Sequence, residues 1–331
     1  MIQKSAMPPL VSIIIPCYNA ENWVRQSIQS ALDQTWSPVE VIVIDDGSTD
    51  KSLEVIKSFG SKIIWETGPN RGANHARNRG LELAKGEYFQ FLDADDYLLP
   101  GKIERQMKVF PASGADVIYE DWQRMQEQPD GSCVWYSGVS GEHPDILEAF
   151  LGIWVPQVLT VLYARRVFEK NILWDEKLTS AQDWEMHIRL AMAGVTYLYL
   201  PGCFTVIRRP LAPTISTRSP RQLEDNIVGI LKKAETRLNE SGLLNDRYKR
   251  AMAGAYLALA CGTNQYFDRD RPRFEELVQH AQRLSPSCVY PYSPFYTLMG
   301  KIFGVRNAER MRSFKRRWLV QTDTSNNHQL H

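Results

Sequence analysis

The chain has 331 residues, of which 44% are apolar and 23% charged, and its formal net charge is +1. This size and mixture are typical of a globular protein with a large core, and they argue against collagen, a disulfide-rich miniprotein or a disordered chain. A net charge near zero gives no general attraction to polyanions, so we expect no nucleic-acid partner.

The first third of the chain alternates short β-branched runs with helical patterns. Such alternation predicts a parallel sheet with helices packed on it. In the last of these helices Ala73, Ala76 and Gly80 follow one another at helical spacing, and residues this small let a helix pack closely. Strands are predicted at Leu10–Pro16, Glu40–Asp45, Ser61–Glu66 and Tyr88–Leu92, and helices at Glu21–Asp33, Asp50–Phe59 and Gly72–Ala84.

From Asp116 the pattern changes to short strands, with a turn at Pro129–Gly131 between the segments around Trp122 and Trp135. This change suggests a mixed sheet edge. A helix at Asp183–Ala193 then leads into a strand at Thr196–Leu200. The fold class that we predict is α/β, with a Rossmann-like, nucleotide-binding sheet that is mixed but mainly parallel and has flanking helices.

Beyond Arg221 the pattern is helical, and we expect a separate C-terminal helical region. We place the boundary near residue 218, within Pro210–Pro220. The predicted domains are residues 1–218, which bind nucleotide-sugar and acceptor, and residues 219–320, followed by a disordered tail at 321–331. The helices of the second region are expected at Gln222–Asn239, Tyr248–Tyr266 and Arg273–Leu284.

The five cysteines are scattered and form no C-x-x-C pair, a pattern that indicates neither a disulfide framework nor a zinc knuckle. No run reaches the roughly 20 apolar residues that a membrane span needs. Met1–Pro9 lacks the basic and apolar regions of a signal peptide. We therefore expect a cytoplasmic protein with reduced thiols.

Polar clusters follow three of the predicted strands. Because ligands bind outside the carboxyl ends of the strands in an open parallel sheet, these clusters are candidate site residues. Asp93 and Asp95 follow one strand, and carboxylates one residue apart are suitable ligands for Mg²⁺ or Mn²⁺, ions that also bind a diphosphate. A solvated acidic turn is the alternative.

The other two clusters offer groups that suit a nucleobase. Asp46, beside Asp45, is placed to accept hydrogen bonds from the edge of a base, although helix capping is an alternative for this loop. Pro16 and Tyr18 follow the first strand, where the tyrosine ring offers a stacking face beside the amide of Asn19. An ordinary turn would also explain them.

These elements, in this order, resemble glycosyltransferase family 2, whose members have the A-type nucleotide-diphospho-sugar transferase fold. The resemblance covers roughly residues 9–218, and its motifs match Val11–Asn19, Gly72–Gly80 and Phe91–Asp96. It implies that the nucleobase is bound near Pro16, Tyr18, Asn19 and Asp46. It also implies that Arg71, Arg77 and Asn78 lie near the nucleotide or its sugar. Asp93 and Ala94 would contact the nucleotide-sugar, and Asp93 and Asp95 would hold the metal ion.

A further motif, beginning at Gln182-Asp183-Trp184, matches the family's E-D-W segment. The resemblance implies that Asp183 is the general base and that the sugar is transferred in a single displacement with inversion. Gln182 replaces the usual glutamate. The alternative for Asp183 is a carboxylate that the helix dipole favours at a helix start.

The loop from Ile207 to Ser216 departs from the family, because it lacks the histidine that many relatives carry. Arg208, Arg209 or Ser216 could meet the diphosphate instead, since guanidinium groups suit phosphate oxygens. A solvated basic loop is the alternative.

Basic and apolar residues alternate in Phe295–Val320, which carries Glu309 as its single acid. This pattern is typical of an amphipathic segment on an anionic membrane surface, and it would place the protein peripherally at the inner face of the membrane. A helix packed on its own core is the alternative.

The resemblance therefore implies a glycosyltransferase that uses Mn²⁺ or Mg²⁺. It would transfer a sugar, with inversion, from a nucleotide-diphospho-sugar donor to a hydroxyl of a glycan, lipid-linked or polysaccharide acceptor. We expect a UDP-linked donor, since Asp46 could accept from the N3–H of uracil. One alternative is a nucleotidyltransferase, which would need a Gly-rich basic loop that Pro16–Glu21 does not provide. The other is a degenerate nucleotide-sugar or glycan binder.

Overall fold

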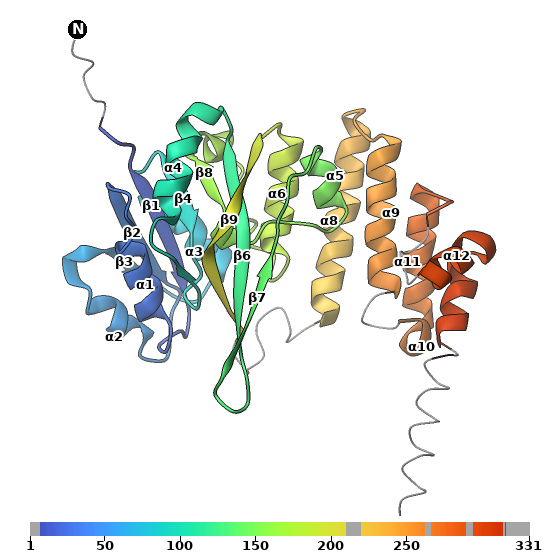
Figure 1. The fold of residues 1–331 in the computed structure, drawn as a ribbon, viewed down its shortest axis with the longest axis horizontal. Coiled ribbons are helices and arrows are strands. Elements are labelled where there is room, and N and C mark those ends of the chain that lie inside the picture. The colour runs from blue at the N-terminus through green and yellow to red at the C-terminus, as the bar shows by residue number, and fades with distance from the viewer. Residues whose placement is uncertain (1–6, 210–219, 262–265, 289–293, 314, 316–331) are drawn as a thin grey trace, which may run out of the picture. The chain divides into compact units, whose positions relative to one another are not determined.

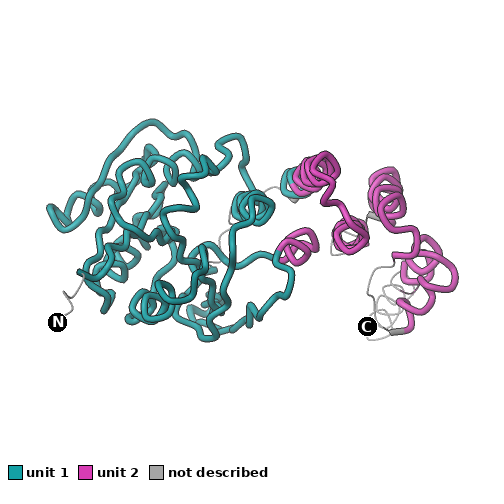
Figure 2. Tube along the Cα trace, turned by 90° about the horizontal axis from the view of Figure 1, so that it is seen from above, with its two compact units in different colours: residues 1–146, 155–226 teal, residues 147–154, 227–331 magenta. Residues whose placement is uncertain are grey.

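The computed structural model describes residues 7–209, 220–261, 266–288, 294–313 and 315. The chain divides into two compact units, one of residues 1–146 and 155–226, the other of residues 147–154 and 227–331 (Figure 2). The boundary predicted near residue 218 and the disordered tail predicted at 321–331 both lie outside the described residues.

The first unit is built on a mixed sheet, which nine strands form in its described part (Figure 1). The strand order is β3-β2-β1-β4-β8-β6-β9-β5, with β7 paired to β6. Neighbours from β3 to β4 are parallel, and β8 runs antiparallel to both β4 and β6. The bounds are β1 (Val11–Cys17), β2 (Val39–Asp45), β3 (Ile64–Thr67), β4 (Tyr88–Phe91), β5 (Tyr97–Leu98), β6 (Val117–Glu127), β7 (Cys133–Gly138), β8 (Leu162–Ala164) and β9 (Tyr197–Arg209).

Helices cover both faces of the parallel part. Apolar residues of α1 and α4 join Ile13 and Ile15 of β1 in the hydrophobic core. On the other side of β1, α3 packs so closely that a Cβ on Gly80 would lie 2.3 Å from Ile14 Cγ2. The close packing predicted from small residues is confirmed. The helices of this unit are α1 (Val24–Leu32), α2 (Ser52–Lys57), α3 (Ala73–Leu83), α4 (Lys102–Ser113) and α6 (Gln182–Met192), with 3₁₀ turns at Gly60–Lys62, Val158–Thr160 and Arg165–Lys170.

The prediction of short strands after Asp116 is wrong, because β6 and β9 are long and pair in parallel along most of their length. The predicted strand stopped at Leu200 because Pro201 and Gly202 resemble breakers. Register shifts beside Asp121 accommodate these two residues, and Asp121 Oδ2 accepts a hydrogen bond from the Gly202 N–H (3.0 Å). The strand therefore continues to Arg209. The predicted turn between β6 and β7 is confirmed, with Ser132 N–H bonded to Asp130 Oδ1.

The second unit is helical in its described part. Its bounds are α5 (Ile146–Leu151), which begins in the first unit, α8 (Pro220–Glu240), which spans the division at 226/227, α9 (Asp246–Cys261), α10 (Tyr266–Arg269), α11 (Arg271–Leu284) and α12 (Pro294–Phe303). Residues 305–313 are also helical. Phe274 and Leu277 of α11 are fully buried, as is Tyr256 of α9. None of the helices in the described ranges is long and apolar enough to cross a bilayer.

Candidate active site

The carboxyl ends of β1, β2 and β4 meet at one edge of the sheet. Cys17 at the end of β1 pairs with Asp45 of β2, and Ile14 pairs with Phe91 of β4. The polar loops that follow the three strands are therefore neighbours, as predicted for a ligand crevice. Tyr18 is half exposed there.

Asn19 links the first two of these loops. Its backbone has φ 49°, and its N–H donates to Ser48 Oγ (3.0 Å), while its side-chain Oδ1 accepts from the Thr49 N–H (2.8 Å). Gly47, at φ +75°, approaches the next loop so closely that a Cβ would lie 2.8 Å from the Asn70 nitrogen. Asn19 thus orders the loop beside Tyr18.

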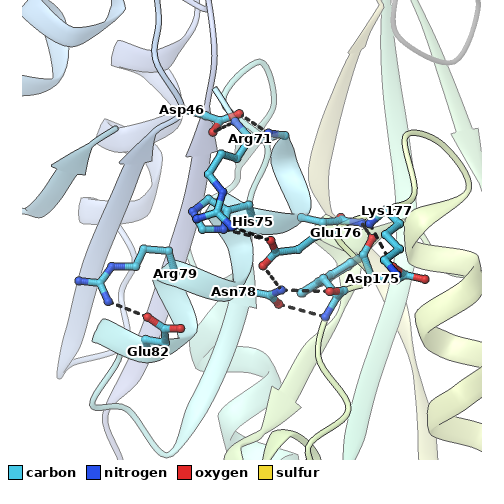
Figure 3. Close-up of polar contacts among 12 residues, drawn as sticks. Asp46, Arg71, His75, Asn78, Arg79, Glu82, Asp175, Glu176 and Lys177 are labelled. Carbon is cyan, nitrogen blue, oxygen red and sulfur yellow. Dashed lines mark hydrogen bonds and ion pairs between the residues drawn. The ribbon is translucent and has the colours of Figure 1, made fainter. Parts of the chain in front are cut away.

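Asp46 and Asp45 brace the segment that leads into α3. The Asp46 oxygens accept from the N–H groups of Arg71 (2.8 Å) and Gly72 (2.7 Å) (Figure 3), and Asp45 Oδ2 accepts from the Thr67 hydroxyl (2.6 Å). These hydrogen bonds give a structural reason for the two adjacent carboxylates, Asp45 and Asp46. Each Asp46 oxygen has a second lone pair with which it can still accept from a ligand.

Arg77 of α3 is a buried cation that joins three elements. Its Nη2 donates to Asp93 Oδ1 (2.8 Å), and its Nη1 donates to Gln182 Oε1 (3.0 Å) and Asn74 Oδ1 (3.1 Å). The guanidinium carbon lies 4.7 Å from the ring centroid of Trp174. The loop after β4 and the start of α6 are therefore held by the same side chain.

Three carboxylates crowd the loop after β4. Burial raises the pKa of Asp95, and the charge of Asp93 raises it further. Asp96, which is buried and accepts from the Arg208 N–H (2.8 Å), has its pKa raised well above the ordinary value by burial and then by both neighbours. Mutual repulsion of this kind is relieved by a cation.

The donor chemistry at this loop fits a hard divalent ion. Asp93 keeps a third of its side chain exposed, and carboxylate oxygens are the ligands that Mg²⁺ and Mn²⁺ prefer. Within the described residues no group of three or more His, Cys, Asp or Glu side chains could hold a metal ion.

Asp183 lies in the first turn of α6, where its Oδ1 accepts from the Trp184 N–H (2.9 Å). Burial raises its pKa; the Trp184 hydrogen bond and the charge of Arg77 oppose that shift, and Asp93 reinforces it. Asp183 is therefore electrostatically close to both Arg77 and Asp93. The structure brings the predicted base and a predicted metal ligand to the same place.

Arg208 does not extend toward a ligand as the sequence suggested. Its guanidinium is buried between the rings of Trp23 (4.9 Å) and Tyr97 (4.8 Å), and it donates to the Asp95 carbonyl oxygen (2.8 Å) and to Gln26 Oε1. It braces the loop that carries Asp95. Arg209 Nη1 donates to the Arg208 carbonyl (3.5 Å), and Ser216 lies outside the described residues.

Glu176 is a site residue that the sequence analysis missed. Its carboxylate contacts Arg71 (3.4 Å), His75 (3.2 Å) and Asn78 (3.1 Å) (Figure 3), and the Asn78 hydrogen bond is the main cause of its lowered pKa. The Asn78 amide also bonds both backbone groups of Trp174. Asn78, predicted to lie near the nucleotide, thus fixes the segment that stacks on Arg77. A contact spanning about a hundred residues leaves no local spacing signal.

The chain is similar to known proteins in sequence and in fold. The sequence model of "Glycosyl transferase family 2" matches residues 12–130. An uncharacterized glycosyltransferase of Rickettsia prowazekii is 31% identical over 239 residues, which cover 70% of this chain and 74% of that protein. One from Rickettsia typhi is 32% identical over 200 residues, and the chain spans 63% of its length, slightly less than two thirds.

Two further similarities bear on fold and extent. A hyaluronan synthase of Pasteurella multocida is 32% identical over 191 residues, but the match covers only 19% of that protein. The crystal structure of S. aureus TarS 1-349 in complex with UDP-GlcNAc superposes with a TM-score of 0.66 at 18% identity, covering 92% of this chain and 91% of that one. At this identity the likeness concerns the fold, and the predicted α/β class with a C-terminal helical region is confirmed.

Proposed function

Because the chain belongs to glycosyltransferase family 2, we propose that it transfers a sugar from a nucleotide-diphospho-sugar to a hydroxyl of a glycan, lipid-linked or polysaccharide acceptor. The observation that carries the proposal is that Asp93, which is bonded to Arg77, lies electrostatically close to both Asp95 and Asp183 at the carboxyl edge of the sheet. A nucleotidyltransferase would need a Gly-rich phosphate loop after β1, where this chain has Tyr18 and Asn19. A degenerate binder would have no use for the carboxylates of Asp95 and Asp183.

The proposed nucleotide lies against the loops after β1 and β2. The exposed ring of Tyr18 offers a stacking face, and Asp46 holds the neighbouring loop while keeping lone pairs for the N3–H of uracil. We propose a UDP-linked donor. The complex of TarS with UDP-GlcNAc supports this choice by analogy of fold.

We propose that Asp93 and Asp95 hold Mn²⁺ or Mg²⁺ together with the donor diphosphate. When bound, such an ion supplies Lewis-acid stabilisation of the departing nucleoside diphosphate. Arg77 fixes Asp93 in position, and Arg208 fixes the Asp95 backbone. The loop is thereby preorganised for its ligands before they arrive.

Asp183 is the proposed general base. An acceptor hydroxyl attacks the anomeric carbon and loses its proton to the Asp183 carboxylate. The bond from the anomeric carbon to the diphosphate oxygen breaks, and its electron pair leaves with the nucleotide. Attack opposite the leaving group inverts the configuration. A pKa raised by burial makes Asp183 a better proton acceptor than an exposed carboxylate.

A donor screen tests this proposal. UDP-, GDP- and dTDP-sugars are incubated with Mn²⁺ and the wild type, Asp183→Asn or Asp246→Asn, and release of nucleoside diphosphate is measured. Asp246 is the matched control, since it also lies in the first turn of a helix but in the second unit. We expect wild type and Asp246→Asn to release UDP at rates within twofold, and Asp183→Asn to be slower by about 10²–10⁴-fold with unchanged UDP affinity.

Two results would overturn the proposal. The first is that no donor is consumed by the wild type. The second is that Asp183→Asn retains more than about a tenth of wild-type turnover, which is more than loss of a general base allows. Glu185, the next acid of α6, is paired with Arg189 (2.7 Å).

We also propose peripheral contact of α12 with an anionic membrane. Phe295, Leu298 and Ile302, at helical spacing, are 51–57% exposed, and Lys301 and Arg310 are exposed nearby. Only part of the basic segment predicted at Phe295–Val320 is available for contact with a membrane. Arg306 pairs with Glu275 (2.5 Å), Arg312 donates to the Cys261 carbonyl (2.8 Å), and Val305 and Ala308 are buried.

A further inference from the structure

The hairpin of β6 and β7 carries large exposed side chains that the donor site does not use. All three are in β7: Trp135 is 51% exposed, Tyr136 53% and Val134 40%. Figure 1 shows the turn of this hairpin beyond the rest of the sheet. Exposed apolar groups of this size, gathered on one short strand, are typical of an interaction surface.

Strand register places Trp135 on the same face of the sheet as Arg208, which contacts the loop of Asp95. Trp135 pairs with Met125 of β6, and Met125 pairs with Arg208 of β9. Directly paired residues point to the same face, and Arg208 reaches from that face to the Asp95 carbonyl. Two strand spacings, about 9–10 Å, separate the backbones of Trp135 and Arg208. Tyr136, the next residue, points to the opposite face.

The hairpin is held rigidly at its base. Gly138 pairs with Trp122, and a Cβ at Gly138 would lie 2.2 Å from the Trp122 ring, so the ring covers the glycine backbone. The guanidinium of Arg124 lies 4.9 Å from the Trp122 ring centroid. A strand packed at its base presents Trp135 at a lower ordering cost than a free loop would when a ligand binds.

Trp135 is surrounded by hydrogen-bonding groups on its face. Gln123 pairs with Ser137 and Glu127 pairs with Cys133, and these pairs flank the Met125–Trp135 pair. The side chains of Gln123 and Ser137 make no hydrogen bond to any residue that the structure describes. A flat apolar ring beside open amide and hydroxyl groups matches a pyranose, which has an apolar C–H face and a rim of hydroxyls.

We propose that Trp135 is the platform on which a pyranose ring of the acceptor glycan stacks, with Gln123 and Ser137 bonding its hydroxyls. This proposal rests on the proposed function, and it names the acceptor class as a carbohydrate that extends at least one ring beyond the reacting hydroxyl. Because Trp135 shares a sheet face with Arg208, which donates to the Asp95 carbonyl, we favour the acceptor as its ligand. A second copy of the chain pairing along the edge of β7 is the competing occupant.

Oligosaccharide binding to the full chain tests the platform. Chitopentaose, cellopentaose and a hyaluronan octasaccharide are titrated by saturation-transfer NMR against the wild type, Trp135→Ala, Trp135→Phe and Tyr136→Ala, with UDP and Mn²⁺ titrated separately. Tyr136→Ala is the matched control, because it removes an equally exposed aromatic ring from the same strand but from the other face. We expect at least one oligosaccharide to bind the wild type, at least tenfold weaker binding by Trp135→Ala, partial recovery in Trp135→Phe, and less than twofold change in Tyr136→Ala.

Each other outcome overturns a defined part of the account. The platform is wrong if the wild type binds no oligosaccharide, if Trp135→Ala binds as the wild type does, or if both alanine variants lose binding equally. A change of molecular mass by light scattering in Trp135→Ala would assign the strand to self-association instead. Failure of the wild type to bind UDP would overturn the donor assignment, while Trp135-dependent oligosaccharide binding would still support the platform.

Discussion

Among single residues, Arg77 connects several parts of the site, because one buried guanidinium bonds Asp93, Asn74 and Gln182. Lysine keeps the charge but cannot bond in several directions, so Arg77→Lys would leave buried acceptors unsatisfied, at about 1–3 kcal/mol of unfolding free energy. We expect lower stability in urea and weaker UDP binding. Arg79→Lys, an exposed arginine of the same helix, should change neither quantity appreciably.

A second prediction for a single residue concerns the charge of Asp183. Its pKa is raised in the folded protein, so the native state binds the proton more tightly than the unfolded chain, and stability falls as the pH rises through the folded pKa. Keeping the carboxylate ionised at neutral pH therefore costs stability. Asp183→Asn should unfold at a higher temperature than the wild type at pH 7, and the difference should shrink on acidification. A lower unfolding temperature at pH 7 would show that the charge stabilises the fold.

The sequence was informative about residues whose role depends on local position. The motifs identified Asp93, Asp95 and Asp183, and strand ends brought the first two together with the predicted base-binding loops. It was misleading for Arg208, because residue type alone does not show that Trp23 and Tyr97 enclose the side chain. The roles of such residues depend on partners that are distant in the sequence.

At the scale of elements, α4 is tied to the sheet by a buried polar cluster. Lys102 Nζ donates to Gln106 Oε1 (3.0 Å) and to Gln90 Oε1, and it interacts electrostatically with Glu120 of β6. Burial lowers the pKa of Lys102 and raises the pKa of Glu120, whose oxygens make no hydrogen bond to any described residue. The Lys102 charge therefore depends on Glu120, which is stabilised by both Lys102 and Arg105 (4.0 Å).

Removing the charge of Lys102 alone should lower the free energy of unfolding. Lys102→Met leaves the buried Glu120 with only Arg105, 4.0 Å away, as a cation partner, so we expect a loss of up to about 3–5 kcal/mol in unfolding free energy. The double variant Lys102→Met/Glu120→Gln should recover at least about 1 kcal/mol of that loss. Lys108→Met, on the exposed side of the same helix, is the control in the urea titrations. Strict additivity of the two single changes would show that the pair is not coupled.

Helices and strands were predictable from the sequence wherever the periodic pattern of apolar residues was uninterrupted. The strands and helices before residue 92 agree with the structure to within a few residues. The extension of β9 through Pro201 and Gly202 was not predictable, because the Asp121 contact that accommodates these residues depends on a partner strand eighty residues away. The helix α4 was not predicted, although Ile103, Met107 and Phe110 have helical spacing.

At the scale of the whole molecule, the second unit adds a surface that the donor site does not need. Leu298→Ser/Ile302→Ser removes exposed apolar side chains from α12, and Leu243→Ser removes an equally exposed leucine elsewhere in this unit. We expect the first variant to co-sediment less than the wild type with phosphatidylglycerol-containing vesicles at low salt, and the second to be unchanged. Equal sedimentation of all three proteins would assign α12 a structural role.

The central claim is that the loop after β4 binds a nucleoside diphosphate through a divalent ion. Calorimetric titration of UDP, with and without Mn²⁺, into the wild type, Asp95→Asn and Asp33→Asn tests it most directly, Asp33 being an exposed carboxylate at the end of α1. Carboxylate and diphosphate repel each other without a cation between them. We expect Mn²⁺ to strengthen UDP binding at least tenfold in the wild type and in Asp33→Asn, and we expect this gain to be lost in Asp95→Asn. Equal UDP affinity under all six conditions would contradict the central claim.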